Sequence, residues 1–280
     1  MIKIHGEVVN IEFFPDGTPR INVDTDNIKE NAYEDSSLGY INIEWNYESN
    51  DEMFYLMLVK RHLERFLTNV DYYLFLPYIP NARMDRTKSY DEVFTLKYFC
   101  EFVNWLNFDT VFVLDAHSDV SVALLNKCEN NNPKDYIDKA ISTIGMRNLV
   151  LYFPDSGAAK RYAGLFPEIP YCYGEKSRDW KTGKILGLDV RTNGIDLKNK
   201  AVLIIDDIIS YGGSLHHGAL KLKKLGVEEI YAYATHTENS ILDREKGTLI
   251  KDLENNTVRR LFTTNSLFTG EHEKIIVMEV

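Results

Sequence analysis

Hydrophobic residues along the chain recur in two alternating patterns. Between residues 51 and 67 the apolar side chains have the spacing of one helix face, and the apolar run YYLFLPYI follows. The same order returns where helical spacing over 90–106 leads into TVFVLDAH. Helices that alternate with apolar strands are typical of a parallel sheet, whose strands are buried on both faces by the helices. The first half of the chain is therefore predicted to be an α/β unit.

The second half repeats this alternation. Its predicted strands are RNLVLYFPD, IPYCYG, AVLIIDD and EIYAYATH, and its predicted helices cover 156–165 and 214–225. Short additional strands are expected near the N-terminus, at 3–13, 21–23 and 40–44. The polar stretch CENNNPKD is expected to be a connection. We predict two α/β units, 1–140 and 141–280, each a mainly parallel sheet flanked by helices.

The composition narrows the class of partner. The formal net charge of -10 over 280 residues argues against nucleic-acid binding, which relies on an excess of Lys and Arg. The three cysteines are widely spaced without a C-x-x-C pattern, which favours a reducing compartment. No apolar run approaches a membrane span, and the first residues do not resemble a secretory signal. We expect a cytoplasmic protein that grips anionic ligands locally and has no membrane partner.

The segment AVLIIDDIISYGGSLHHG combines carboxylates with glycines. Asp206 and Asp207 end a predicted strand, where α/β sheets bind ligands. In the loop that follows, Gly212 and Gly213 let backbone amides approach an anion, and the next helix adds the partial positive charge of its N-terminus. Paired carboxylates can hold sugar hydroxyls or a hydrated metal ion. The alternative is that these residues only end a strand and cap a helix.

This segment resembles the phosphoribosyl-diphosphate-binding motif of type I phosphoribosyltransferases and of ribose-phosphate diphosphokinases. A second segment, PYIPNARMDR, resembles the diphosphokinase motif of a strand, an aromatic turn and A-R-x-D-R, which the transferases lack. Further resemblances follow in the family's order along nearly the whole chain. The resemblance implies two phosphoribosyltransferase-like domains, the N-terminal one carrying the ATP motifs and the C-terminal one carrying the acceptor loop and a flap.

For ATP, the resemblance implies roles for PYIPNARMDR and for the N-terminal turn FPDGT. Arg83 and Arg86 can offer forked donors to nucleotide phosphates while Asp85 orients one of them, although surface salt bridges are the alternative. FPDGT is similar to the family's F-x-D-G-E turn, which packs on the adenine of a neighbouring subunit. Phe14 and Asp16 match that turn, and a plain β-turn is the alternative. We expect a homodimer or a larger homo-oligomer.

For the metal, the resemblance implies one residue in each half. His117 follows a predicted strand at the place of the family's D-L-H motif, whose histidine contacts the metal and the nucleotide phosphates. Asp155 lies in FPDSG, which resembles the family's P-D-x-G segment that helps to hold catalytic Mg²⁺. A cap at the start of the following helix is the alternative role for Asp155.

The charged segment EKSRDWKTGK, at 175–184, is a candidate flap. Lys176 and Arg178 match the first and third positions of the family's K-R-R loop, and Ser177 replaces the middle arginine. A mobile cationic loop could close over the β-phosphorus, neutralising charge and excluding water during diphosphoryl transfer. A solvated run of charges is the alternative.

The acceptor loop departs from the family pattern. It contains Ser210, Tyr211, Gly212, Gly213 and Ser214, where the family has an acidic residue, Thr, any residue, Gly and Thr around a terminal 5-phosphate. The tyrosine would suit a larger, phosphodiester-like acceptor such as ADP-ribose, which a branch of the family diphosphorylates in NAD synthesis. Ribose 5-phosphate and ADP-ribose both remain open as acceptors.

The predicted function is therefore transfer of the β,γ-diphosphate of Mg-ATP to the C1 hydroxyl of a ribose 5-phosphate-type acceptor. His117, Lys176 and Arg178 are the predicted catalytic residues. Two alternatives remain. A phosphoribosyltransferase would consume phosphoribosyl diphosphate without ATP, and a regulatory paralogue would bind nucleotides without catalysis.

Overall fold

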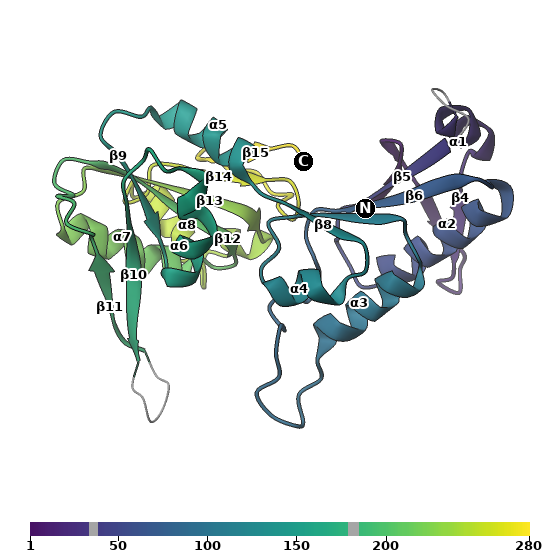
Figure 1. The fold of residues 1–280 in the computed structure, drawn as a ribbon, viewed down its shortest axis with the longest axis horizontal. Coiled ribbons are helices and arrows are strands. Elements are labelled where there is room, and N and C mark those ends of the chain that lie inside the picture. The colour runs from purple at the N-terminus through teal and green to yellow at the C-terminus, as the bar shows by residue number, and fades with distance from the viewer. Residues whose placement is uncertain (34–38, 179–184) are drawn as a thin grey trace. The chain divides into compact units, whose positions relative to one another are not determined.

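The computed structural model describes residues 1–33, 39–178 and 185–280, with only the backbone described at 176–178 and 185–188. The chain divides into two compact units, Met1–Asn132 and Pro133–Val280 (Figure 1). Helix α5 (Lys134–Ile144) belongs to the second unit because it packs on strands of that unit's sheet. The division accordingly falls before residue 140.

The first unit is built on a six-stranded sheet in the order β2-β1-β5-β6-β7-β8. Strands β5 to β8 run parallel, and β1 joins β5 antiparallel. The strands are β1 (Ile2–Ile4), β2 (Glu7–Val8), β5 (Gly39–Trp45), β6 (Val70–Leu76), β7 (Thr110–Leu114) and β8 (Cys128–Asn131). The helices are α1 (Thr25–Ala32), α2 (Glu52–Phe66), α3 (Thr95–Trp105) and α4 (Asp119–Leu124).

The hydrophobic pattern explains why these elements pack as they do. Ile41, Ile43 and Trp45 alternate along β5 and are fully buried. They join the apolar faces of α2 and α3 in one core, to which α2 contributes Leu56 and Leu63. An amphipathic helix and an alternating strand can each bury only one face, so this packing is what stabilises both.

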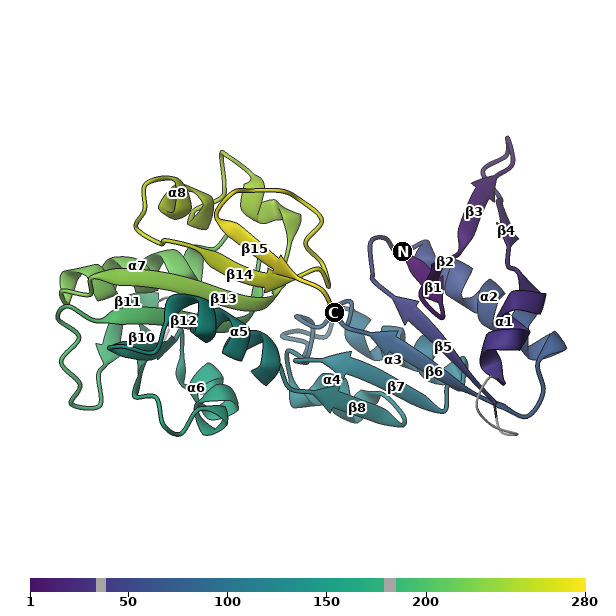
Figure 2. The ribbon, with the colours of Figure 1, turned by 90° about the horizontal axis from the view of Figure 1, so that it is seen from above.

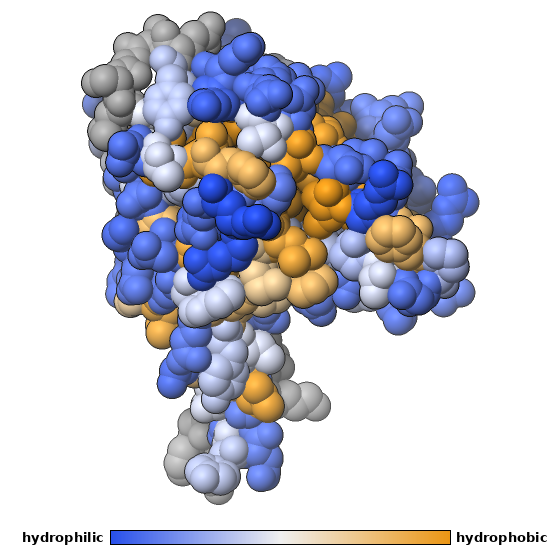
Figure 3. All heavy atoms as spheres, turned by 90° about the vertical axis from the view of Figure 1, so that its right-hand side faces the viewer, coloured by the Kyte–Doolittle hydropathy of each residue, from blue (hydrophilic) through white to orange (hydrophobic). Residues whose placement is uncertain are grey.

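A separate hairpin, β3 (Asn10–Phe13) with β4 (Pro19–Asn22), projects from this sheet (Figure 2). The hairpin packs against α2, where the rings of Phe13 and Tyr55 are arranged edge-to-face with their centroids 6.1 Å apart. Apolar surface is exposed at this end of the unit (Figure 3). Phe13, Phe14 and Phe54 each leave about half of their surface exposed. Exposed apolar clusters of this kind mark contact surfaces.

The second unit has a seven-stranded sheet in the order β11-β10-β9-β12-β13-β14-β15, parallel except for β11. The strands are β9 (Leu149–Phe153), β10 (Tyr171–Arg178), β11 (Ile185–Arg191), β12 (Ala201–Ile209), β13 (Glu229–Thr237), β14 (Leu261–Thr264) and β15 (Ile275–Met278). Besides α5, the helices are α6 (Ser156–Tyr162), α7 (Gly213–Lys224) and α8 (Leu249–Glu254), with short 3₁₀ turns at Ala163–Leu165 and Asn239–Leu242.

Successive residues of β12 point into two different cores. Val202 and Ile204 pack with α7 and α8, whereas Leu203 and Ile205 pack with α5 and α6 on the other face. Burial on both faces explains the continuous apolar run AVLII. The predicted fold class, parallel sheets flanked by helices, is confirmed in both units.

Several predicted boundaries were wrong. Residues 128–131 were expected to be a connection but form β8, which pairs with β7 from Val111 to Leu114. As an edge strand with mostly exposed side chains, β8 can be polar, so its sequence carries no strand pattern. The expected strand at 3–13 is divided by a turn at His5 and Gly6, both with positive φ. The helix expected from residue 90 begins only at Thr95.

The three cysteines are free thiols, and Cys100 and Cys172 are buried. Burial raises the pKa of each of these two thiols to about 12, so both stay protonated at neutral pH. None of the helices in the described ranges combines the length and the apolar composition needed to span a bilayer.

Glu52, at the start of α2, provides a test of this packing. Its buried carboxylate accepts hydrogen bonds from Trp45 Nε1 at 3.0 Å and from the Glu48 N–H at 2.8 Å. Glu52→Ala should lower the free energy of unfolding by about 3 kcal/mol, because these two donors, the Ser49 N–H and the N-terminal ammonium of Met1 all lose their acceptor. Urea denaturation followed by tryptophan fluorescence measures this change. Glu101→Ala, which removes an exposed carboxylate of α3, should change it by less than about 0.5 kcal/mol. Equal effects of the two changes would contradict the argument.

Candidate functional site

Carboxylates gather at one edge of the second unit's sheet. Strands β9 and β12 are parallel neighbours, with Tyr152 paired to Ile204. Asp155 follows β9, and Asp206 and Asp207 lie near the end of β12, so all three lie at the carboxyl edge. This is the edge where open α/β sheets bind ligands, and the pairing register brings together residues about fifty positions apart in the chain.

The electrostatics of this edge favour a ligand that offers donors or positive charge. Burial raises the pKa of Asp206 well above its ordinary value, and the charges of Asp207 and Asp155 raise it further. Asp206 Oδ1 accepts the N–H of Asp207 at 3.1 Å. Arg161, on α6, places Nη1 3.3 Å from Asp207 Oδ2 and compensates part of the negative charge. The remaining repulsion would be relieved by sugar hydroxyls or a cation.

Asp155 also has the structural role named as its alternative. Its Oδ1 accepts the N–H groups of Gly157 at 3.0 Å and Ala158 at 3.1 Å, which caps α6. No group of three or more His, Cys, Asp and Glu side chains in the described ranges is arranged to hold a metal. Mg²⁺ usually takes only one or two carboxylates and completes its shell with water and phosphate oxygens. The oxygen donors of Asp155, Asp206 and Asp207 fit a Mg²⁺ ion carried largely by a nucleotide.

The acceptor loop between β12 and α7 is held on one side by the start of α8. Gly212 has a φ of +85° and directly precedes α7. A Cβ at Gly212 would lie 2.3 Å from Leu249 Cβ, so only glycine fits. The carbonyl of Tyr211 accepts both the N–H of Thr248, at 2.8 Å, and its hydroxyl, at 2.9 Å. The start of α8 therefore holds the loop in place.

The opposite side of this loop is open. A Cβ at Gly213 would meet nothing within 4 Å, and Ser214 is exposed in the first turn of α7. Ser210 Oγ lies 3.3 Å from Ser240 Oγ. The Tyr211 side chain is 38% exposed. No side chain therefore crowds Gly213 at the start of α7, which is a favourable geometry for an anion.

In the first unit, two motifs emerge at the carboxyl edge of neighbouring strands. PYIPNARMDR follows β6 and His117 follows β7, and the N–H of Leu114 donates to the carbonyl of Pro77 at 3.1 Å. Arg83 and Arg86 are exposed. Arg86 Nε lies 3.9 Å from Asp85 Oδ1, and 83% of the Arg86 side chain is exposed, so this ion pair is weak.

Strand β8 positions the turn that leads to His117. Asp115 is buried with a φ of +47°, and its N–H donates to the carbonyl of Asn131 at 2.8 Å. Asn130 Oδ1 accepts the N–H of Ala116 at 3.1 Å. The polar sequence of β8 thus shapes the loop of the candidate histidine.

The turn of the β3–β4 hairpin has the geometry of a β-turn. Gly17 donates its N–H to the carbonyl of Phe14 at 2.8 Å. Asp16 Oδ1 accepts the Thr18 hydroxyl at 2.7 Å and the Thr18 N–H at 3.0 Å, and these bonds lower the pKa of Asp16. Thr18, where the family has glutamate, therefore stabilises the turn and leaves Phe14 exposed at the tip.

The candidate flap is described only in part. Lys176 and Arg178 lie on β10, where their backbones pair with Leu188 and Ile185 of β11. Their side chains, and residues 179–184, lie outside the described residues. The stretch expected to be a loop thus starts as an antiparallel strand.

Two residues of the site were not predicted from the sequence. Arg161 lies about one and a half turns after Asp155, in a helix that was predicted to begin at residue 156. Helical spacing could therefore have indicated that Arg161 lies near the site. The Tyr152 hydroxyl is buried without a hydrogen-bond partner among the described residues. Burial raises its pKa, and so do the charges of Cys172, Asp155 and Asp206. No local pattern indicates this proximity, which depends on the pairing of β9 with β12.

Comparison with known proteins identifies relatives that match more than half of the chain. No protein-family model matches it. It is 30% identical over 244 residues to the ribose-phosphate pyrophosphokinase of Pyrococcus abyssi, covering 84% of this chain and 79% of that protein. It is 32% identical over 165 residues to the enzyme of that name from Pyrococcus furiosus and 30% over 164 residues to that from Saccharolobus solfataricus. These two matches cover 58% of this chain and little more than half of the relatives, 57% and 55%.

The fold agrees with these relatives. The crystal structure of phosphoribosylpyrophosphate synthetase from Mycobacterium smegmatis matches with a TM-score of 0.71 at 18% identity, covering 97% of this chain and 86% of that one. The resemblance inferred from the motifs is confirmed, and the chain belongs to the ribose-phosphate pyrophosphokinase family.

Proposed function

We propose that the protein transfers the β,γ-diphosphate of ATP to the C1 hydroxyl of a ribose 5-phosphate-type acceptor and releases AMP. The observation that carries this proposal is the carboxyl edge of the second unit. There, Asp206 and Asp207 lie beside the open start of α7, with Arg161 compensating one of the two carboxylates. This combination suits a ligand that bears both hydroxyls and a phosphate.

The acceptor binds to two kinds of group at this edge. Its ribose hydroxyls donate to Asp206 and Asp207, which relieves the repulsion that raises the pKa of Asp206. Its phosphate accepts from the N–H groups at Gly213 and Ser214 and from the Ser210 hydroxyl. Because α8 fixes the loop before the ligand arrives, little ordering is required on binding.

ATP binds through the motifs of the first unit. Arg83 and Arg86 donate to the nucleotide phosphates, and their exposure leaves them accessible. The exposed Phe14, on a turn held by Asp16, packs on an adenine ring, in a neighbouring copy if the assembly follows the family. The exposed apolar surface at this end of the unit supports a homodimer or larger homo-oligomer.

In the chemical step, the acceptor's C1 oxygen attacks the β-phosphorus and loses its proton. A new C1–O–Pβ linkage forms while the bond from the bridging oxygen to the β-phosphorus breaks, and AMP leaves. His117 in the first unit and Asp155 in the second are the residues proposed as Mg²⁺ ligands, and the ion would supply charge neutralisation. Lys176 and Arg178 close over the transferred group, so that positioning and electrostatics provide the catalysis.

The altered loop favours ADP-ribose over ribose 5-phosphate. Tyr211 replaces a small hydroxyl residue and so removes a potential donor to a terminal phosphate. Its partly exposed ring could stack on the added adenosine, while its fixed backbone keeps the loop shape. Ribose 5-phosphate remains the second candidate, because Ser210, Ser214 and the helix start are retained.

The proposal is tested by incubating the protein with Mg²⁺, ATP and each acceptor in turn. AMP release and product mass are followed together. An added diphosphate on ADP-ribose supports the favoured acceptor, and one on ribose 5-phosphate supports the second. Absence of AMP with both acceptors would refute catalysis and favour a regulatory paralogue. Consumption of phosphoribosyl diphosphate without ATP would indicate a transferase.

Tyr211→Thr should shift acceptor preference. Restoring a small hydroxyl and removing the ring should raise kcat/KM for ribose 5-phosphate relative to ADP-ribose by about tenfold, which corresponds to about 1.4 kcal/mol. Steady-state kinetics with both acceptors provides the measurement. Tyr98→Thr, at an exposed ring on α3, serves as the control and should leave the ratio unchanged. An unchanged ratio in both variants would remove Tyr211 from acceptor selection.

Asp206→Asn should stabilise the folded protein while lowering its activity. Because the pKa of Asp206 is raised on folding, its ionised form destabilises the folded state, increasingly as pH rises above the ordinary carboxyl value. The change should raise Tm by about 2–4 °C near neutral pH, with no gain near about pH 4, and lower kcat/KM by about 100-fold.

Asp16→Asn is the matched comparison, because the pKa of Asp16 is lowered by its hydrogen bonds to Thr18. The ionised Asp16 carboxylate stabilises the folded state at neutral pH, and this stabilisation is lost in acid. Asp16→Asn should therefore lower Tm at neutral pH. The two variants should therefore differ in sign in melting curves recorded across the pH range. A destabilised Asp206→Asn at neutral pH would overturn the electrostatic argument.

A further inference from the structure

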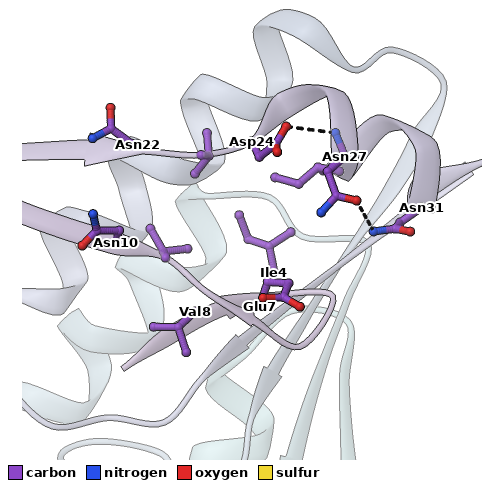
Figure 4. A pocket seen from close by; sticks show the side chains of 11 residues that line it. Ile4, Glu7, Val8, Asn10, Asn22, Asp24, Asn27 and Asn31 are labelled. Carbon is purple, nitrogen blue, oxygen red and sulfur yellow. Dashed lines mark hydrogen bonds between the residues drawn. The ribbon is translucent and has the colours of Figure 1, made fainter.

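A pocket in the first unit lies outside the motifs assigned to ATP and acceptor. It has a volume of about 510 Å³ and is bounded by β1, β2, the base of the β3–β4 hairpin and α1 (Figure 4). Its apolar part is formed by the buried side chains of Ile4, Val9 and Ile28 and by Val8, which is 58% exposed. The ATP motifs instead follow β6 and β7, so this pocket is a separate feature of the same unit.

Two pairs of amides line the pocket. Asn10 and Asn22 are directly opposite each other in the β3–β4 ladder, so their side chains lie on the same face of the hairpin. Asn27 and Asn31 are one turn apart on α1, and Asn31 Nδ2 donates to Asn27 Oδ1 at 3.2 Å. Amides can donate and accept, so they adapt to a ligand with several polar atoms.

Two carboxylates determine the charge of the pocket. Glu7 comes from β2, and Asp24 caps α1 by accepting the N–H of Asn27 at 3.1 Å. The lining contains no Lys, Arg or His. Within the described ranges, no hydrogen bond or ion pair involves the side chains of Glu7, Asn10 or Asn22. Nearby Lys3 and Arg20 are directed to other carboxylates, Glu44 at 3.8 Å and Glu12 at 3.9 Å.

We propose that this pocket binds an aliphatic diamine or polyamine. Ammonium groups donate to the carboxylates of Glu7 and Asp24 and to the amide oxygens around them. The methylene groups between the ammonium ions cover the exposed Val8 side chain, which an inorganic cation would leave in contact with water. Nucleotides and phosphate are disfavoured, because the lining holds two carboxylates and no cationic side chain.

Calorimetric titration of the protein with putrescine tests the proposal. Saturable binding with one site per chain is expected, and its affinity should weaken with added salt. 1,4-Butanediol, which has the same carbon chain without charge, should not bind. Since the readout is binding without ATP or acceptor, the result is independent of the proposed diphosphokinase activity.

A pair of double variants locates the site. Glu7→Gln with Asp24→Asn removes both charges while the asparagine keeps the helix cap, and should weaken putrescine binding by about tenfold or more. Asp26→Asn with Glu30→Gln removes two charges from the same helix outside the pocket and should leave binding within about twofold. Equal weakening in both doubles, equal binding of the diol, or no saturation up to about 10 mM putrescine would overturn the proposal. Circular dichroism verifies that each variant is folded.

Discussion

The parallel pairing of β12 with β9 on one side and β13 on the other is the constraint on which the candidate acceptor site depends. Parallel strands end at a common edge, so the residues that follow them are brought together however far apart they are in the chain. Here that edge collects Asp155, Asp206 and Asp207, with the start of α7 beside them. The pairing is itself maintained by burial, because β12 contributes side chains to the cores on both faces of the sheet. A shift of register would move the carboxylates and exchange the two cores at once.

The same constraint makes the site electrostatically costly. Three carboxylates near one another, one of them with a strongly raised pKa, oppose folding in the absence of a ligand. Arg161 offsets part of this cost from a helix that Asp155 caps, so one short helix supplies both a carboxylate and its counter-charge. The loop between β12 and α7 adds a second specialised element, in which Gly212 fits against Leu249 and the Tyr211 carbonyl is held by Thr248. The tyrosine side chain remains partly exposed, so the position that departs from the family pattern can vary without disturbing the loop backbone.

The candidate binding residues of the first unit differ from these in exposure and charge. Its candidate phosphate-binding residues, Arg83 and Arg86, are exposed, and Arg86 pairs only weakly with Asp85, whereas the histidine loop is held by backbone and amide hydrogen bonds from β8. The hairpin and α1 then create a pocket whose charge is opposite to that of a phosphate site. In a chain of net charge -10, cationic side chains are thus present where anions are expected, at Arg83 and Arg86, and absent from the lining of this second pocket. The distribution of charged side chains, more than the net charge, distinguishes the surface that suits anions from the pocket that suits cations.

By itself, the sequence determined the order of helices and buried strands, the fold class and the positions of the chemical motifs at strand ends. These properties follow from local periodicity and from residue types that lie close together in the chain, such as Asp206 and Asp207 before Gly212. Only the tertiary structure decided that the polar stretch 128–131 is a strand, that Arg161 meets Asp207, that α8 fastens the acceptor loop, and that Tyr152 lies near the carboxylates. An edge strand is stabilised by backbone hydrogen bonds that do not require apolar side chains, and the other contacts join residues on different elements. No local pattern encodes such contacts, because they depend on which strands pair and in which register.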